Sequence, residues 1–126
     1  MKSEVKRIER GWPGHYICAN RCLFRLNTLL EYKDKKIVVS TVGNMYMDNK
    51  PEMIGHNRWY ETMVFYGKQD GYYIEADVSQ ELHSDQDWGI WAESYDELPD
   101  DVDNVANQMH ESIVQEFIQK LKDGEV

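Results

Sequence analysis

The stretch CLFRLNTLLEYKDKKIVVSTVGNMY, residues 22–46, decides the fold. Its first part divides into two alternating sets of side chains, as the pleat of a β-strand requires. One set contains Cys22, Phe24, Leu26, Thr28, Leu30 and Tyr32, and the other contains Leu23, Arg25, Asn27, Leu29 and Glu31. A polar turn, KDK at 33–35, follows, and the β-branched run after it predicts a return strand. The stretch therefore predicts a β-hairpin.

A second hairpin is predicted further along the chain, after a polar link at 47–57 that contains Pro51 and Gly55. Residues 58–82 read RWYETMVFYGKQDGYYIEADVSQEL, with a turn expected at Gln69-Asp70-Gly71. The Asp-Gly pair is a strong short-range turn signal. The segment DWGIWAE, residues 87–93, is expected to add a fifth, short edge strand.

The C-terminal part of the chain has the pattern of an amphipathic helix. Apolar residues recur there at spacings of three and four, at Val102, Val105, Ala106, Met109, Ile113, Phe117 and Leu121. Pro99, Asp100 and Asp101 favour a helix start, and Gly124 follows the last two lysines. The predicted fold is α+β: an antiparallel sheet of two hairpins with four to five strands, and the helix packed on one face. A single domain over residues 1–126 is expected.

Composition favours an intracellular, cytoplasmic protein. The chain has 126 residues, of which 41% are hydrophobic, which is enough for a core without disulfides or metal. The first residues, MKSEVKRIER, are charged and do not resemble a signal peptide. No apolar run approaches the ~20 residues that span a bilayer. The two cysteines do not form a secreted disulfide framework.

The net charge of −9 is unevenly distributed. Residues 1–50 carry +5, whereas residues 51–126 carry −14. This asymmetry predicts two differently charged faces, one of which attracts anions. Direct binding to a nucleic-acid backbone is not expected, because the chain as a whole would be repelled.

The stretch RGWPGHYICANRCLFRLNTLL, residues 10–30, contains the ligand types of a zinc site. The weak candidate ligands are His15, Cys18 and Cys22, with His56 completing the set from elsewhere in the fold. Cys22 also alternates with apolar neighbours, as a core cysteine does. The GWPGH segment is typical of a turn, with Trp12 closing the end of the sheet. We therefore expect no cofactor, with zinc as an alternative.

Two catalytic alternatives have weaker signals. Cys18 beside His15 offers a thiol near a base, although no carboxylate is recognisably placed to orient the histidine. Acids and a histidine also gather in the segment EADVSQELHSDQD, at Glu75, Asp77, Glu81, His83, Asp85 and Asp87. Such a group could hold a divalent cation for hydrolysis, but acids of this kind are more often solvated surface.

An anion pocket is the favoured site. Arg21, Arg25 and Asn27 project from the first hairpin, and Arg58, Tyr60 and Thr62 recur at every second position of the next. Guanidinium groups, amide or hydroxyl groups and aromatic rings together suit a ligand that has an oxyanion and a flat ring. The alternative is that these arginines pair with acids such as Glu31, Glu61 or Glu75.

The strings RGWPGHYICANRCLFRLNTLL, VVSTVG (38–43) and YETMVF (60–65) resemble a family of small proteins found in bacterial genomes, prophages and mobile elements. The resemblance covers residues 8 to about 120. It implies a compact intracellular accessory protein. By analogy with other phage-borne proteins of this size, it also implies an inhibitor of host defence.

Three functions follow as hypotheses. The first is a non-enzymatic phage-type protein that acts in counter-defence by binding a small anionic, nucleotide-like ligand. The second is an acidic inhibitor, similar to anti-CRISPR proteins, whose residues Asp100, Asp101 and Asp103 help to mimic nucleic-acid phosphates for a host defence protein. The third is a metal-dependent hydrolase built on Asp77, His83 and Asp85. The aromatic content also predicts a homo-oligomer.

Overall fold

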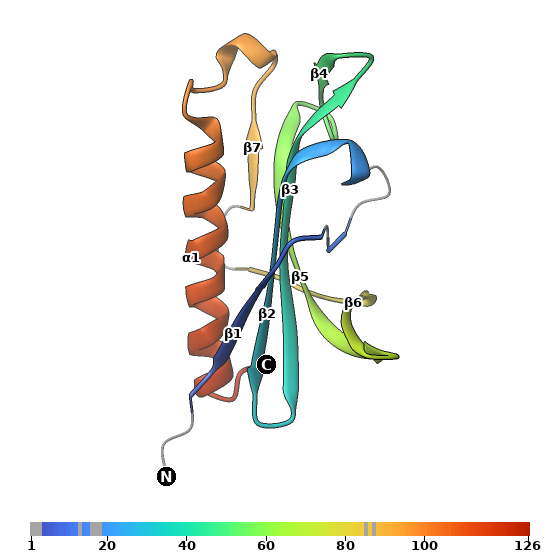
Figure 1. The fold of residues 1–126 in the computed structure, drawn as a ribbon. Coiled ribbons are helices and arrows are strands. Elements are labelled where there is room, and N and C mark those ends of the chain that lie inside the picture. Colours follow the sequence, from blue (N-terminus) through green and yellow to red (C-terminus); the bar gives the residue numbers. More distant parts are fainter. Residues whose placement is uncertain (1–3, 13, 16–18, 85, 87) are drawn as a thin grey trace.

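The computed structural model describes residues 4–12, 14, 15, 19–84, 86 and 88–126. Over these residues the chain forms an antiparallel sheet and a long C-terminal helix, α1 (Val102–Lys122). The strands are β1 (Lys6–Arg10), β2 (Cys22–Tyr32), β3 (Lys35–Met47), β4 (Lys50–Glu52), β5 (Arg58–Asp70), β6 (Tyr73–Leu82) and β7 (Gly89–Trp91). Two short 3-10 turns are η1 (Ala19–Arg21) and η2 (Tyr95–Glu97). Figure 1 shows α1 lying along one face of the sheet.

The main strand order is β1-β2-β3-β5-β6, with β4 paired to β3 and β7 paired to β5. The α+β class, both predicted hairpins and the edge strand β7 are confirmed, but the described residues form a sheet of seven strands instead of four to five. The strands β1 and β4 were not predicted. Four of the five β1 residues are charged, and β4 has three residues including Pro51. β4 folds back through Asp48 and Asn49, whose positive φ angles of 53° and 64° suit a two-residue hairpin turn.

The main core lies between α1 and the sheet. Four buried residues of the helix, Ile113, Val114, Phe117 and Leu121, pack against Leu30, Ile37, Val39 and Val64 of the central strands. These helix positions include the last three of the predicted apolar stripe, so its orientation is confirmed. Within the part of the chain that the structure describes, no helix combines the length and the apolar character needed to cross a membrane.

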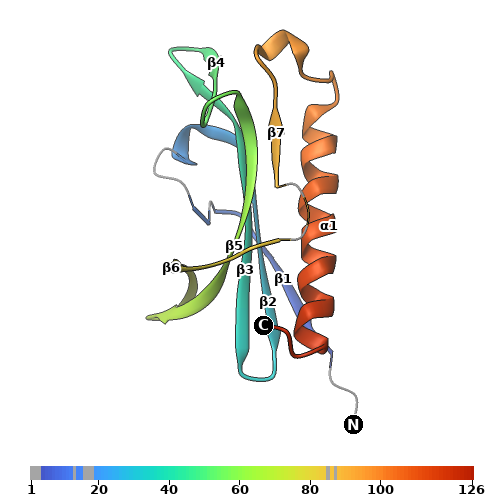
Figure 2. The ribbon, with the colours of Figure 1, turned by 180° about the vertical axis from the view of Figure 1, so that it is seen from behind.

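The face of the sheet opposite α1, called the distal face below, is partly covered. Figures 1 and 2 show η1 and the β5–β6 hairpin on the side of the sheet away from α1. The sheet is strongly coiled, and Arg10 at the end of β1 donates a hydrogen bond to the backbone carbonyl of Ile74 in β6. Strands at opposite ends of the main strand order therefore meet across the distal face.

The middle of β6 is irregular. Gly67 of β5 pairs with Ala76 of β6, and the next pair along β5 is Phe65 with Glu81. Residues 77–80 of β6 therefore bulge out of the ladder. The Asp77 carboxylate accepts hydrogen bonds from the Ser79 hydroxyl at 2.6 Å and from the Ser79 backbone N–H at 3.1 Å. These bonds hold the pKa of Asp77 below its ordinary value. The bulge interrupts the outer edge of the sheet.

Candidate functional site: a hollow on the distal face

The two sets of residues predicted to share one anion pocket are not brought together. Arg25 and Asn27 share the distal face, as their alternation predicted. Tyr60 and Thr62 lie in register rows next to theirs, opposite Gly43 and Thr41, and point to the other face, beneath α1. Adjacent rows of a sheet face opposite sides, so the expectation of a common wall is wrong.

Most of these side chains have other partners. The Tyr60 hydroxyl donates to Asp103 of α1, and burial together with this bond raises the pKa of Tyr60. Thr62 shares a 2.6 Å hydrogen bond with Thr41. Arg58 pairs with Glu61 at 3.3 Å, which confirms the alternative reading for this arginine. Arg21 and Arg25 are exposed.

The residues proposed as metal ligands are also dispersed. Cys22 is buried against Val42, Met45 and Ile54, as expected for a core cysteine, and His56 is exposed. Cys18, Asp85 and Asp87 lie outside the described residues. The described residues contain no group of three or more His, Cys, Asp or Glu side chains that could hold a metal ion. The structure therefore adds nothing in favour of zinc or of the hydrolase hypothesis.

His15, the remaining proposed ligand, is nearly buried and holds the chain after β1 on the distal face. Its Nδ1 lies 2.7 Å from Ser40 Oγ, and its Nε2 lies 3.1 Å from Glu61 Oε1. A serine, a histidine and a carboxylate that are hydrogen-bonded in this order resemble the catalytic triad of a hydrolase. Ser40, however, is 0% exposed and its Oγ also accepts a hydrogen bond from the Gly14 N–H. The group therefore works as a clamp and not as a reactive site.

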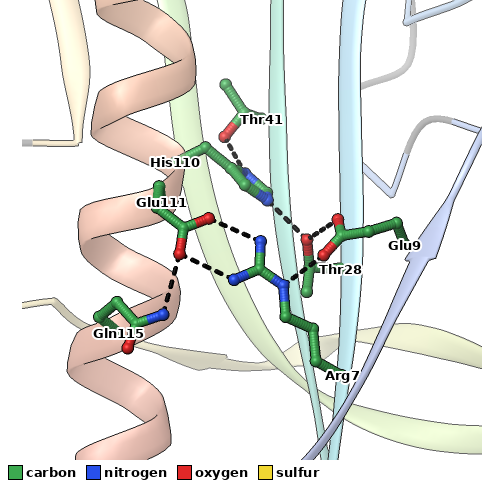
Figure 3. Close-up of polar contacts among 7 residues, drawn as sticks. All are labelled: Arg7, Glu9, Thr28, Thr41, His110, Glu111 and Gln115. Atoms are coloured by element: carbon green, nitrogen blue, oxygen red, sulfur yellow. Dashed lines mark hydrogen bonds and ion pairs between the residues drawn. The ribbon is translucent and has the colours of Figure 1, made fainter.

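A second buried polar group lies between α1 and the sheet, as Figure 3 shows. His110 is 2% exposed, with Nδ1 2.7 Å from Thr41 Oγ1 and Nε2 2.7 Å from Thr28 Oγ1. Burial lowers the pKa of His110 to about 4, so the ring is neutral at pH 7. Thr28 donates to the Glu9 carboxylate at 2.7 Å, so it accepts from the Nε2–H, and Nδ1 accepts from Thr41.

Arg7 closes this buried group at its rim. Its guanidinium donates to both carboxylate oxygens of Glu111, at 2.8 and 2.6 Å, and also to Glu9. The bond from Arg7 lowers the pKa of Glu111 to about 2, with a contribution from Gln115. The whole set ties β1 to α1, and its residues are not among those that line the hollows described below. We assign it a structural role.

The candidate site is a hollow of about 360 Å³ on the distal face, called the distal hollow below. It is lined by Arg10, Trp12, Gly14, Asn27, Lys68, Glu75, Ala76 and Val78. β1 and the residues after it supply the first three, β2 supplies Asn27, and the β5–β6 hairpin supplies the rest. Asn27 is the one residue of the predicted pocket that lines it.

Two other hollows are less suited to an anion. One, of about 240 Å³ beside η2, has Asp96 and Asp100 in its wall and no basic residue. The other, of about 380 Å³ at the edge of β5, contains Arg58, which already faces the Glu61 carboxylate. Glu81 also lines this hollow. Of these three, the distal hollow has the largest share of cationic lining. A fourth hollow, between the β2–β3 turn and the end of α1, has three lysines in its wall, but its volume of about 140 Å³ is well below the ~300 Å³ of small ligand sites.

Arg10 gives the distal hollow its chemistry. Its Nε and Nη2 donate to Asn27 Oδ1 at 3.1 and 3.0 Å, and its Nη1 donates to the Ile74 carbonyl. Its guanidinium carbon lies 4.9 Å from the centre of the Trp12 ring. All of these partners are neutral. Burial lowers the pKa of Arg10, whereas Glu31 and Glu75 act on it only through space and in the opposite direction.

The contrast with Arg7 shows what is unusual here. Arg7 has two carboxylate partners, and its pKa is raised. Among the described residues, no carboxylate forms an ion pair with Arg10. A partly buried cation without a counter-ion costs electrostatic free energy, which a bound anion would restore.

Sequence reasoning missed Arg10, Trp12 and Lys68 as site residues. The RGW triplet places Arg10 beside Trp12 in the sequence. The triplet indicates a site only once β1 is known, because the pairing of β1 with β2 brings Arg10 opposite Asn27. The expectation that Trp12 closes the end of the sheet is wrong. Trp12 is instead 44% exposed, and its ring meets Tyr73 edge-on at 6.0 Å.

Comparisons of this chain with protein-family models, with curated proteins and with solved structures found no match. The resemblance to small prophage proteins therefore stays a prediction.

Proposed function

We propose that this chain is a non-enzymatic binding protein that captures a small anionic, nucleotide-like ligand in the distal hollow. The observation that carries the proposal is the setting of Arg10, whose hydrogen-bond and ring partners among the described residues are all neutral. Each of its three guanidinium nitrogens makes one hydrogen bond, so two N–H groups remain for a ligand. Forked N–H donors of this kind suit the oxygens of a phosphate or carboxylate.

The other lining residues support a ligand that has a flat ring. The Trp12 indole is stacked on the Arg10 guanidinium and still exposes 44% of its surface. Lys68, from β5, adds a second positive charge to the lining. The volume of about 360 Å³ is near the lower end of the ~300–1,000 Å³ that is typical of ligand sites. One mononucleotide-sized molecule suits this space better than a dinucleotide.

In this proposal the captured ligand is a signal of a host defence system, and its removal serves counter-defence. That part rests on the resemblance to phage-borne proteins. Phage or defence genes on either side of this gene would support it, whereas a conserved housekeeping neighbourhood would oppose it.

Replacing Arg10 with glutamine is expected to weaken anion binding by roughly tenfold to a hundredfold. The change removes a charged donor whose hydrogen bonds to an anion are worth ~1.5–3 kcal/mol. Isothermal titration of the wild type and the variant with inorganic pyrophosphate and with nucleoside monophosphates measures the effect. Lys68→Gln should give a smaller loss, and it leaves the hydrogen bonds among the described residues in place, because none of them comes from the exposed Lys68 side chain.

Arg25→Gln is the matched control, because Arg25 lies on the same face, is exposed and does not line the hollow. Its affinity for each anion should equal that of the wild type. The proposal fails if the wild type binds none of these anions at millimolar concentration. It also fails if Arg10→Gln and Lys68→Gln bind them as tightly as the wild type does.

A second candidate function is favoured by the charge distribution. No lysine or arginine occurs in residues 69–119, and Asp96, Glu97, Asp100 and Asp101 are exposed around η2 and the start of α1. This surface would suit the basic groove of a defence nuclease.

Neutralising Asp96, Asp100 and Asp101 should abolish a salt-sensitive association with such a nuclease, measured by interferometry at low and high salt. Asp103 is left unchanged, because it accepts the Tyr60 hydrogen bond. An affinity for the nuclease that changes neither with the substitutions nor with the salt concentration would exclude this function.

A further inference from the structure

Glu75, an exposed residue, places a negative charge in the lining of a hollow that otherwise favours anions. It lines the distal hollow from β6, and its direct cross-strand partner in β5 is Lys68. Among the described residues, no ion pair joins Glu75 to Lys68 or to Arg10. The carboxylate of Glu75 is therefore available to accept hydrogen bonds within the hollow.

A carboxylate at this point acts on ligands in two opposite ways. It repels the anionic part of any ligand and so weakens the binding of a bare anion such as phosphate. It also accepts hydrogen bonds from any N–H or O–H group that the ligand presents. For a ligand that carries hydrogen-bond donors beside its anion, the hydrogen bonds to the carboxylate offset the repulsion, whereas a bare anion experiences the repulsion alone. Glu75 therefore affects the specificity of the hollow more than its affinity.

We propose that Glu75 makes the distal hollow selective for ligands that join an anion to nearby hydrogen-bond donors, as ribonucleoside monophosphates do. This inference rests on the proposed function and adds the ligand class to it. Arg10 and Lys68 bind the phosphate, Trp12 stacks on the base, and Glu75 accepts from the donors. Two parts of such a ligand supply donors: the vicinal hydroxyls of the ribose and the amino group of the base.

The test compares four ligands by isothermal titration. AMP carries both kinds of donor, the 2′,3′-dideoxy analogue lacks the hydroxyls, purine riboside 5′-monophosphate lacks the amino group, and inorganic phosphate has neither ring nor sugar. Wild-type protein should bind AMP at least threefold to tenfold more tightly than one of the two analogues, and that analogue identifies the donor. Phosphate alone should bind most weakly.

Glu75→Gln should change both measurements, in opposite directions. Its affinity for inorganic phosphate should rise severalfold, because a negative charge has been removed, whereas its preference for AMP over the weaker analogue should shrink toward one. Glu81→Gln is the matched control: Glu81 lies on the same strand, outside the distal hollow. It should keep the wild-type affinities and ratios.

The outcomes separate this inference from the proposed function. If AMP binds and Arg10→Gln weakens it, but both analogues bind as AMP does, the inference on Glu75 is overturned and the anion site stands. An unchanged AMP preference in Glu75→Gln overturns it equally. If no anion binds the wild type, both fail together.

Discussion

Acidification from pH 7 to pH 4 is expected to lower the free energy of unfolding by about 3 kcal/mol through His110 alone. The unfolded histidine takes up a proton near pH 6.5, whereas burial delays this in the folded protein to about pH 4. Between these values the unfolded state binds more protons, so stability falls as the pH falls. The interval corresponds to about 3 kcal/mol, because each pKa unit is worth ~1.36 kcal/mol. Urea unfolding at a series of pH values measures it.

A variant isolates this contribution. Glutamine at position 110 offers an acceptor for Thr41 and a donor for Thr28, and it does not titrate. Because it does not titrate, His110→Gln should lose about 3 kcal/mol less than the wild type on acidification from pH 7 to pH 4. Gln108→Ala is the control, since Gln108 lies on the exposed side of the same helix, does not titrate and should leave the wild-type pH dependence intact. Parallel pH curves for His110→Gln and the wild type would contradict the prediction.

Glu111 adds a separate loss at lower pH. Its pKa is lowered to about 2, chiefly by the bond from Arg7. A carboxyl group with a lowered pKa stabilises the fold above its ordinary pKa of 4.5, and that stability is lost as the pH falls toward 2. The side chain is about half exposed, so its contribution is much smaller than that of His110.

Truncating Phe117 to alanine is expected to destabilise the fold by about 3–5 kcal/mol. The ring is 0% exposed and is surrounded by buried residues of α1 and the central strands. Its removal leaves a cavity in a core that cannot collapse fully, because the sheet and helix backbones are fixed by their own hydrogen bonds. Thermal and urea unfolding should show the loss as a lower midpoint with an unchanged denaturant dependence.

Gln108→Ala is the control for this truncation. Gln108 lies on the exposed side of the same helix, where substitutions usually change stability by less than ~0.5 kcal/mol. A loss below ~1.5 kcal/mol for Phe117→Ala would show that α1 does not form the core described above, since buried Phe→Ala changes cost ~3 kcal/mol or more.

The elements that could be predicted are those whose residues face one environment in a regular pattern. In residues 22–46 apolar side chains alternate with others, because one set packs against α1 and the other set lies on the distal face. In the helix, apolar residues recur at spacings of three and four because one stripe of its surface is buried. β1 lacks such a pattern because its charged residues have specific partners far away in the chain. Arg7 pairs with Glu111 of α1, which no local spacing can indicate.

The candidate site was harder to predict for a related reason. Alternation correctly placed Arg25 with Asn27 and, separately, Tyr60 with Thr62. It could not show that the two pairs face opposite sides, because that depends on the register between strands that are not adjacent in sequence. The distal hollow also depends on the coiling of the sheet, which brings Arg10 to Ile74, 64 residues later in the chain.

The bulge in β6 affects the tendency of the protein to aggregate at high concentration. Cross-β growth needs a flat, continuous row of backbone donors and acceptors on which another chain can stack. The protrusion at residues 77–80 breaks that row into two short pieces. A sheet ending in this way resists being extended into a fibre, even though Tyr73 and Val78 expose apolar surface beside it.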